Sequence, residues 1–454
     1  MRTCVPFLIL LVAMNFIPKG HAQSFNTIYT FPSESVGYEA TGVPYIGSGG
    51  VLYGTTPFGG PNTPCSAITI GCGTVFSLTP PAQPGGLWTQ SILYTFQGAP
   101  DAAEPGAGVK PGPNGTLMGT TTIGGPVSLQ CPGGCGTLFQ LTPPAQNGGA
   151  WTEAVVYKFL KADEYPYGLF AGANGILYGT AQDGGGSKTC YFGCGSVYEL
   201  VSPATGEAWS LTQIHEFALE TGEYPNAPLV AGANGVLYGT TQDGGNDSHL
   251  CGSAGCGTIF SLTPPIPPAT SWTSQDIYRF KGGSDGWEPA TGLILGPNGT
   301  LYGTTYYGGT TGCAGGDGCG TVFSLTPPTQ SGEFWTKTVL YSFQGGNDGN
   351  YPLSYVGDLV VGTGGIIDGT TVQGGGTGCS GQGCGTLFQL TPPVVTGGSW
   401  TESILHAFTG GADGQNPFSG PAIDPNGVLY GFANGGTATS CSGGGCGVVY
   451  QYIP

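Results

Sequence analysis

The sequence PATGLILGPNGTLYGTTYYGGTTGCAGGDGCGTVFSLTPPTQSGEFWTKTVLYSF, residues 289–343, contains one complete unit of the pattern that decides the fold. Residues 292–296 form a short apolar run, and the following Pro-Asn-Gly favours a tight turn because Asn and Gly tolerate positive φ. Residues 301–305 predict a second strand, residues 321–326 a third, and residues 335–343 a fourth. Two prolines end the third strand, since proline cannot donate a ladder hydrogen bond. The unit therefore predicts four antiparallel strands.

This unit is repeated along the chain. In seven places two nearby cysteines precede a glycine and an apolar strand, and these pairs account for 14 of the 15 cysteines. The second cysteine of each pair recurs about every 60 residues, a spacing typical of repeat architectures. Seven units of four antiparallel strands predict an all-β fold, a seven-bladed β-propeller.

The two ends of the chain predict how the ring closes. Residues 446–454 match a third strand, and no fourth strand with a tryptophan follows them. Residues 25–31 (FNTIYTF) match the fourth strands of the other units. We therefore expect the N-terminal strand to pair with the C-terminal blade, which leaves no open sheet edge. A single propeller domain is expected over residues 23–454.

Residues 1–22 have the pattern of a secretory signal peptide. Arg2 supplies a positive start, residues 5–17 a short apolar core, and residues 20–22 a cleavage site of small residues. The apolar core is shorter than a membrane-spanning helix requires. We expect a mature chain without a transmembrane segment, secreted to the extracellular space or the periplasm, and monomeric.

The charge of the chain limits its partners. There are 26 acidic and 9 basic residues, with a net charge of −17. An acidic surface repels phosphate backbones, so nucleic-acid binding is not expected. Cations, basic proteins and neutral sugars are the compatible partners.

The cysteine pairs predict local disulfides, since an exported chain with paired cysteines is typical of a disulfide framework. Redox chemistry and metal binding are alternatives, although a zinc site needs about four ligands and each loop offers two cysteines. The expected pairs are Cys65 with Cys72, Cys131 with Cys135, Cys190 with Cys194, Cys251 with Cys256, Cys313 with Cys319, Cys379 with Cys384, and Cys441 with Cys446.

Acidic loops between the fourth strand of one blade and the first strand of the next share a rim with the cysteine loops. Turn chemistry alone explains many Asp-Gly sequences. The alternative is one functional rim, where carboxylates with aromatic neighbours bind Ca²⁺, a glycan or a protein partner. The candidate binding residues are Asp285, Trp287, Glu288, Asp348, Tyr351, Asp413, Glu164, Tyr165, Glu223 and Tyr224.

Catalytic groups are scarce, and no catalytic residue or required cofactor is assigned. His215 and His406 take the place of a fourth-strand tyrosine, which indicates a structural role. His249 lies near Asp247 in a cysteine loop, a weak candidate pair. Asp368 replaces the tyrosine of the Leu-Tyr-Gly pattern, and a carboxylate at such a buried position needs a partner or a shifted pKa.

The pattern LYGTT, a cysteine pair, CGTVF, LTPP and a tryptophan-led strand resembles the GloVer-type tandem repeats of exported bacterial proteins. The resemblance covers nearly all of the chain after residue 22. It implies export and a repeat architecture, and it adds no catalytic residue, because the family has no established activity. Its members are often anchored by C-terminal modules, whereas this sequence ends at its last repeat.

Two functional hypotheses follow. The preferred one is an exported, non-catalytic binding propeller whose acidic, disulfide-stapled rim recognises a glycan, a cell-wall component or a protein. The alternative is an extracellular carbohydrate-active enzyme, a hydrolase or lyase that uses rim or channel carboxylates. A glycosidase would place two carboxyls about 5–10 Å apart in one pocket, with one pKa raised.

Overall fold

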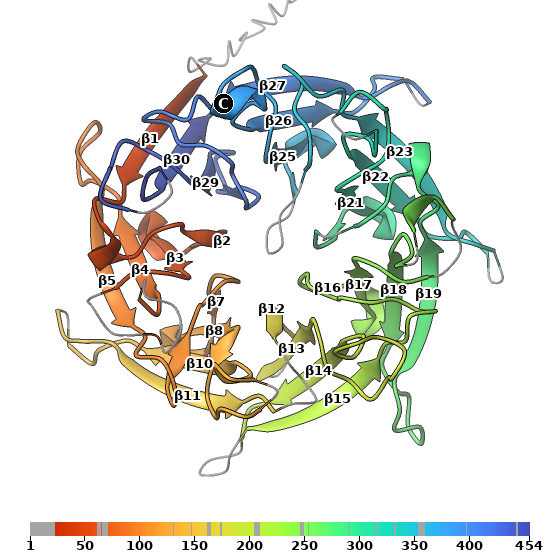
Figure 1. Cartoon of the computed structure of the whole chain (residues 1–454), viewed down its shortest axis with the longest axis horizontal. Helices are drawn as coiled ribbons and strands as arrows, with labels where there is room; N and C mark the ends of the chain where they lie inside the picture. Colours follow the sequence, from red (N-terminus) through yellow and green to blue (C-terminus); the bar gives the residue numbers. More distant parts are fainter. Residues whose placement is uncertain are drawn as a thin grey trace, which may run out of the picture.

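The computed structural model forms a closed ring of seven β-sheets around a central opening (Figure 1). No α-helix occurs in the part of the chain that it describes, and no helix there is long and apolar enough to cross a membrane. The described residues are 23–60, 65, 71–129, 131–146, 148–160, 165–172, 175–203, 209–245, 249–252, 254–289, 291–313, 316–330, 333–352, 359–395, 397–441 and 444–454.

Each sheet, or blade, has four antiparallel strands, which lie side by side in order from the centre of the ring to its outer edge. Blades 1 and 2 contain β2 (Thr41–Ile46), β3 (Leu52–Thr56), β4 (Thr74–Thr79), β5 (Thr89–Thr95), and β7 (Lys110–Pro111), β8 (Leu117–Thr121), β10 (Thr137–Thr142), β11 (Thr152–Lys158). Blades 3 and 4 contain β12 (Pro166–Ala171), β13 (Ile176–Ala181), β14 (Ser196–Val201), β15 (Ser210–Glu216), and β16 (Val230–Ala231), β17 (Leu237–Thr241), β18 (Thr258–Thr263), β19 (Thr273–Arg279).

Blades 5 and 6 contain β20 (Ile294–Leu295), β21 (Leu301–Thr305), β22 (Thr321–Thr326), β23 (Thr336–Ser342), and β24 (Val360–Val361), β25 (Ile367–Thr371), β26 (Thr386–Thr391), β27 (Thr401–Ala407). Blade 7 contains β28 (Ala422–Ile423), β29 (Leu429–Ala433), β30 (Val448–Ile453) and β1 (Ser24–Thr30), and a separate pair joins β6 (Ala102–Ala103) to β9 (Ile123–Gly124). Short 3-10 turns occupy Glu34–Val36, Ser48–Gly50, Pro113–Gly115, Ala233–Gly235, His249–Cys251, Gly283–Asp285, Pro297–Gly299, Thr363–Gly365 and Cys379–Gly381.

The N-terminal strand closes the ring, as the sequence predicts. β1 pairs with β30 from Ser24 opposite Ile453 to Thr30 opposite Val448, with one irregularity in the register. β1 therefore completes blade 7 from the other end of the chain (Figure 1).

The predicted turn of the repeat is present between β20 and β21. Asn298 has φ 58° and Gly299 has φ 76°, the left-handed conformation that this residue pair adopts at low cost. Gly303 in the middle of β21 faces the next strand so closely that a Cβ there would lie 2.8 Å from the Phe323 ring. The Leu-Tyr-Gly pattern thus places backbone against an aromatic ring.

Aromatic rings hold neighbouring blades together at every contact between them, here called a seam. At each seam the phenylalanine after a fourth strand packs against a third-strand ring of the next blade. Ring centroids in these pairs are 4.9 Å (Phe217–Phe260) to 5.5 Å (Phe408–Tyr450) apart, and all of these rings are buried. Such contacts add about 0.5–1.5 kcal/mol per pair beyond the area that they bury.

All seven predicted disulfides are present, and their Cα atoms lie 5.2 or 5.3 Å apart, within the usual range. The bonded pairs are Cys65 with Cys72, Cys131 with Cys135, Cys190 with Cys194, Cys251 with Cys256, Cys313 with Cys319, Cys379 with Cys384, and Cys441 with Cys446. Each cysteine is thus bonded within its own loop.

The bridges pin the cysteine loop to the loop that leads to the next blade. Several of them pack on a glycine that follows the fourth strand of their own blade. At Gly345, with φ 74°, a Cβ would lie 2.8 Å from Cys313 Sγ. Gly410, with φ 77°, has the same position in blade 6, where a Cβ would lie 3.0 Å from Cys379 Sγ. A side chain at either glycine would therefore push the two loops apart.

Candidate binding rim

One residue per blade, in the segment that leads into the innermost strand, has the same unusual backbone. Its φ lies between 45° and 58° although it is never glycine, and such a conformation costs about 1–2 kcal/mol. Proline follows it in six of the seven blades. These seven positions, the left-handed ring, are Glu39, Glu104, Tyr165, Tyr224, Glu288, Tyr351 and Asn416.

The seams fix this backbone. In blade 5 the N–H of Glu288 donates to the carbonyl of Cys256 in blade 4, and its own carbonyl accepts from Tyr306 N–H. The proline that follows packs on the glycine after that cysteine, where a Cβ on Gly257 would lie 2.5 Å from Pro289 Cδ. The Cys-Gly sequence of one blade thus positions the left-handed residue of the next.

The predicted disulfides belong to the scaffold of the rim rather than to its surface. The second cysteine of every pair is almost completely buried, with no more than 3% of it exposed. These residues are Cys72, Cys135, Cys194, Cys256, Cys319, Cys384 and Cys446. Their sulfurs therefore offer a ligand almost no contact area, and they act by holding the loops that carry other side chains.

Three acidic groups come together beside the left-handed ring at blades 4 and 5. Glu223 is 8% exposed, and its backbone pairs with that of Asp243. Burial raises the pKa of Asp243 to about 7, and the negative charges of Glu288 and Glu223 contribute to that rise. Burial also raises the pKa of Glu288 to about 7. These three carboxyls therefore share one electrostatic environment across the seam.

The half-buried amide of Gln242 links two of the seams. The Gln242 side chain hydrogen-bonds Glu288. Gln242 Oε1 accepts from Asn226 Nδ2 at 2.7 Å, and Asn226 is 2% exposed. Because Gln242 is held from both sides, it fixes the Glu288 carboxyl toward blade 4.

Four aromatic rings continue the rim from blade 5 into blade 6. Trp287 stacks on Tyr307 with centroids 4.4 Å apart, and Tyr306 stacks on Tyr351 at 4.8 Å. Tyr306 and Tyr307 contact each other edge to face at 4.4 Å. All four side chains are partly exposed. They form a rigid apolar surface beside the carboxyls.

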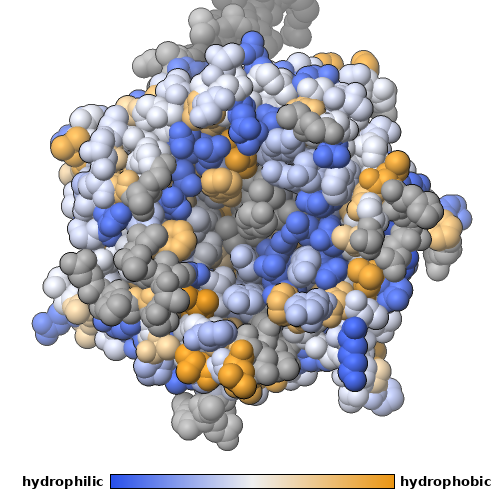
Figure 2. Space-filling model, viewed as in Figure 1, coloured by the Kyte–Doolittle hydropathy of each residue, from blue (hydrophilic) through white to orange (hydrophobic). Residues whose placement is uncertain are grey.

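A cavity of about 410 Å³ opens among these rings at the seam between blades 5 and 6. Side-chain amides and aromatic rings face it, as is typical of small-ligand sites. Its lining includes Tyr306, Tyr307, Asn350, Tyr351, Gln373 and Gln382. We call the rings and carboxyls of this region the acidic–aromatic arc, which consists of Glu223, Tyr224, Asp243, Trp287, Glu288, Tyr306, Tyr307 and Tyr351. Figure 2 shows hydrophilic residues gathered around the hollow centre of the ring.

The structure distributes the predicted rim residues between two environments. Trp287, Glu288, Tyr351, Glu223 and Tyr224 lie in the arc, and Tyr165 belongs to the left-handed ring in blade 3. Glu164 lies outside the described residues. Asp285, Asp348 and Asp413 cap their own loops instead, with partners Tyr278, Tyr341 and His406 in the fourth strands.

The loop-capping aspartates repeat one geometry. Asp285 accepts from Tyr278 Oη at 2.7 Å and from Lys281 N–H at 3.0 Å. His406 takes the tyrosine's place in blade 6, and its Nε2 lies 3.0 Å from Asp413. This is the structural position that the sequence predicts for His406. A ligand-binding role for these aspartates stays a prediction.

Sequence reasoning missed part of the arc. Asp243 and Tyr307 are the second residues after β17 and β21, Tyr306 is the first residue after β21, and Gln373 is the second residue after β25 in blade 6. In the six blades where the structure describes it, the residue before the left-handed position pairs with this place, as Trp287 does with Tyr307. Comparing the residues after each LYGTT sequence would have found them. His249 begins a short 3-10 turn, while Asp247 lies outside the described residues, so the candidate pair stays a prediction.

No group of three His, Cys, Asp or Glu side chains suited to a metal ion occurs among the residues that the structure describes. The binding of Ca²⁺ to the rim stays untested.

One solved structure with a TM-score above 0.5 agrees with the fold, and two others resemble it less. A fungal alcohol oxidase in complex with copper matches with a TM-score of 0.53 and 14% identity over 95% of this chain and 76% of that chain. A NanB sialidase mutant from Streptococcus pneumoniae matches with a TM-score of 0.42, 13% identity, and coverage of 94% and 70%. An α-L-arabinanase from Penicillium chrysogenum matches with a TM-score of 0.40, 14% identity, and coverage of 76% and 91%. At these identities the likeness concerns the fold alone.

No curated protein matches the sequence. The profile of the Gloeobacter/Verrucomicrobia repeat matches three overlapping regions, residues 16–249, 63–312 and 249–454, which together cover nearly the whole chain. Seven blades built on one repeated unit agree with that assignment. The chain belongs to the Gloeobacter/Verrucomicrobia repeat family.

Proposed function

We propose that this protein is exported and that its acidic–aromatic arc binds a glycan. The signal-peptide pattern of residues 1–22 and the seven disulfides support export, because such bridges persist in oxidising compartments.

One observation carries the glycan proposal. Rigid rings and amide side chains meet around one cavity, and Tyr307, which lines it, stacks on Trp287. The carboxyl of Glu288, the residue after Trp287, belongs to the same arc. Sugar rings have apolar C–H faces that suit aromatic surfaces and hydroxyls that suit amides and carboxylates. The carboxyls of Asp243 and Glu288 disfavour acidic sugars by repulsion. The expected ligand is therefore a neutral or amino-bearing polysaccharide.

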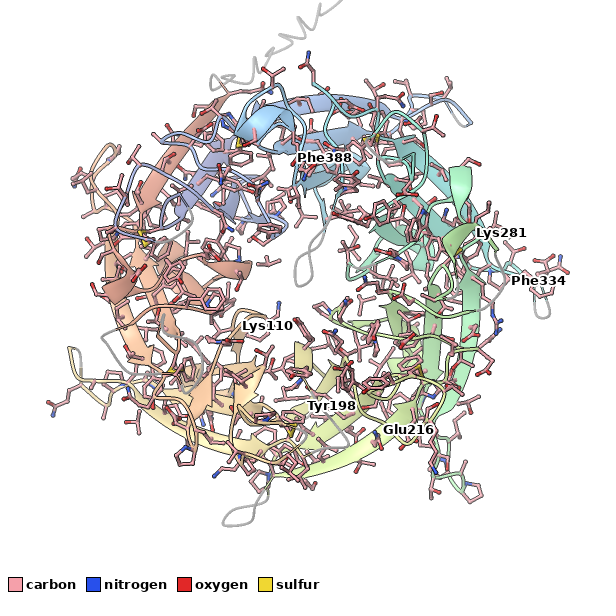
Figure 3. The ribbon with its side chains drawn as sticks, viewed as in Figure 1. Lys110, Tyr198, Glu216, Lys281, Phe334 and Phe388 are labelled. Atoms are coloured by element: carbon pink, nitrogen blue, oxygen red, sulfur yellow. A yellow bond between two sulfur atoms is a disulfide. The ribbon has the colours of Figure 1, made fainter. Side chains whose placement is uncertain are left out.

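Affinity electrophoresis in gels that contain a neutral polysaccharide, chitosan or an acidic polysaccharide tests this proposal. Tyr307→Ala should abolish the retardation by the binding polysaccharide, because it removes the central ring of the surface. Phe334→Ala is the matched control. Phe334 is 92% exposed and projects from the outer edge of the ring (Figure 3). Retention by the acidic polysaccharide alone, or equal loss in both variants, would contradict the proposal.

A second candidate function rests on the carboxyl pair. Asp243 and Glu288 interact electrostatically, and burial raises the pKa of each to about 7, so either carboxyl suits the role of the protonated acid of a glycoside hydrolase. A reducing-sugar assay on the polysaccharides retained in the gel tests it. Release of reducing sugar by the unchanged protein that is lost in both Asp243→Asn and Glu288→Gln would favour the enzyme. Binding of the polysaccharide without release of reducing sugar favours the non-catalytic function.

A further inference from the structure

A second cavity lies at the seam between blades 6 and 7, at the opposite ends of the strands from the acidic–aromatic arc. Its origin is clear from the other six seams. There the residue before the glycine of the second strand, usually tyrosine, packs with a tryptophan that precedes the fourth strand of the next blade. Ring pairs are Tyr178–Trp272, Tyr238–Trp335, Tyr302–Trp400 and Tyr430–Trp88, and Tyr53 with Trp151 and Met118 with Trp209 share core clusters.

Both members of this pair are missing at the blade 6/7 seam. Asp368 stands in the tyrosine position of β25, and Gln23 precedes β1 where the other fourth strands have tryptophan. In blade 5 a Cβ on Gly296 would lie 2.4 Å from the Tyr302 ring. A Cβ on the equivalent Gly362 would have Ile423 Cδ1 as its nearest neighbour, at 3.7 Å. The aromatic filling of the seam is therefore absent here.

The resulting cavity has a volume of about 440 Å³ and mostly apolar walls, with Asp368 as the buried charged group. The walls include Val361, Ile366, Ile423, Pro425 and Pro454. Asp368 is 4% exposed, and Oδ1 accepts from Gln389 Nε2 at 2.8 Å. That is its only hydrogen bond within the described residues.

Nothing basic lines the cavity in the described part of the chain. Its second carboxyl, Asp424, accepts the N–H groups of Asn426 and Val428 in its own turn. A carboxylate offers about four acceptor positions, so Asp368 can accept further donors. A buried carboxylate that faces an apolar cavity is stabilised most by a cation with donors.

We propose that the blade 6/7 cavity binds an alkylammonium group, with the ammonium on Asp368 and the apolar body against Ile366, Ile423 and Pro454. This site is independent of the glycan proposal, because it lies at the other end of the blades. The same chemistry is offered by a small free amine and by the lysine side chain of a protein partner.

Titration calorimetry with cyclohexylammonium chloride, with cyclohexanol and with the peptide acetyl-Gly-Lys-Gly-amide tests the site. At least one of the two ammonium probes should bind, and cyclohexanol should bind at least about tenfold more weakly, since it lacks the charge-assisted contact. Binding by cyclohexylammonium alone identifies a small amine as the ligand, and binding by the peptide identifies a lysine side chain.

Two variants keep the test independent of folding. Asp368→Asn preserves the shape and the contact to Gln389, and it should weaken ammonium binding about tenfold or more. Asp368→Tyr restores the ring of the other blades over Gly362 and should abolish binding while the melting temperature holds or rises. Glu333→Gln, which alters an exposed carboxylate in a loop of blade 5, should change nothing. Equal binding of cyclohexanol, no binding of either ammonium probe, or full binding by Asp368→Asn would overturn the proposal.

Discussion

Asp285→Asn should destabilise the fold because Asp285 neutralises a buried lysine of the next blade. Lys337 Nζ lies 3.0 Å from Asp285 Oδ1, and the two side chains are 2% and 21% exposed. Burial lowers the pKa of Lys337, and the charge of Asp285 acts in the opposite direction. The ammonium lies 5.1 Å from the centroid of Phe280 and 5.2 Å from that of Phe323. Without the Asp285 carboxylate this ammonium would face aromatic rings, neutral groups and the positive charge of Lys281.

The magnitude follows from this geometry. Removing one partner of a buried ion pair lowers the free energy of unfolding by about 3–5 kcal/mol. The lower end of this range applies here, because aromatic rings still stabilise the ammonium and Asp285 is partly exposed. About 3 kcal/mol corresponds to a fall in Tm of about 3 °C for a domain of this size. Lys337→Met should cost less, about 1 kcal/mol, because Asp285 keeps Tyr278 and Lys281 N–H as donors. The double variant should be more stable than Asp285→Asn alone.

Differential scanning calorimetry measures these differences, and Asp348→Asn is the matched control. Asp348 caps its loop with the same two kinds of donor, Tyr341 and a backbone N–H. Its neighbour in the next blade is Glu402, which occupies the position of Lys337. Asp348→Asn removes a repulsion and should cost clearly less. Equal losses for Asp285→Asn and Asp348→Asn, or additive effects in the double variant, would refute the reasoning.

Three further predictions concern pH, packing and the disulfides. The Tm should fall as pH rises from about 5 to 8. Folding raises several carboxyl pKa values, so the folded state binds more protons than the unfolded state in this range. A Tm that rises from pH 5 to pH 8 would contradict this prediction. Gly345→Ala should lower the free energy of unfolding in urea by about 2–3 kcal/mol, because its Cβ would lie 2.8 Å from Cys313 Sγ and the backbone has φ 74°. Gly346→Ala has φ 64° but no atom within 4 Å of its Cβ, so the loss should be about 1 kcal/mol. Replacing Cys313 and Cys319 by serine should cost about 2 kcal/mol in the same assay, and an unchanged midpoint would refute a stabilising role. The carboxyls with the highest folded-state pKa values, about 6 or 7, are Glu153, Asp243, Glu288, Asp368 and Glu402.

The pH prediction has an opposing contribution from two histidines, which acts within the same range, below pH about 6.5. Burial lowers the pKa of His215 and of His406. Protonation of these rings therefore favours the unfolded state below their usual pKa. The carboxyls outnumber them, so their effect should dominate between pH 5 and 8.

The backbone could be predicted well because each local signal agreed with the fold. Residues 301–305 and 321–326 are the strands that the sequence predicts, and the Asn-Gly turn has the expected positive φ angles. The closing strand was also predictable, since the missing fourth strand of one end is present at the other. Because the unit is repeated seven times, each strand and turn pattern could be compared across seven copies, which a domain without repeats does not allow.

Side-chain contacts between blades were not predictable in the same way. Lys337 and Asp285 belong to different units, and nothing in their spacing indicates that the outer strands bring them together. The same holds for Asp243 and Glu288, which interact only because blades 4 and 5 are adjacent at the rim. The spacing of the acidic residues indicated a common rim, but it could not separate loop caps from the residues of the arc.

The repeat itself distinguishes scaffold from function at the left-handed ring. All seven positions have the same backbone conformation and the same place at the seams. That conformation excludes β-branched residues, and it favours Gly or Asn. Glu288 and Tyr351 satisfy it no better than asparagine, which blade 7 uses at Asn416. Because the backbone does not explain the glutamates and tyrosines, their side chains are best explained by what they present to the rim, and this is why the ligand should be sought there.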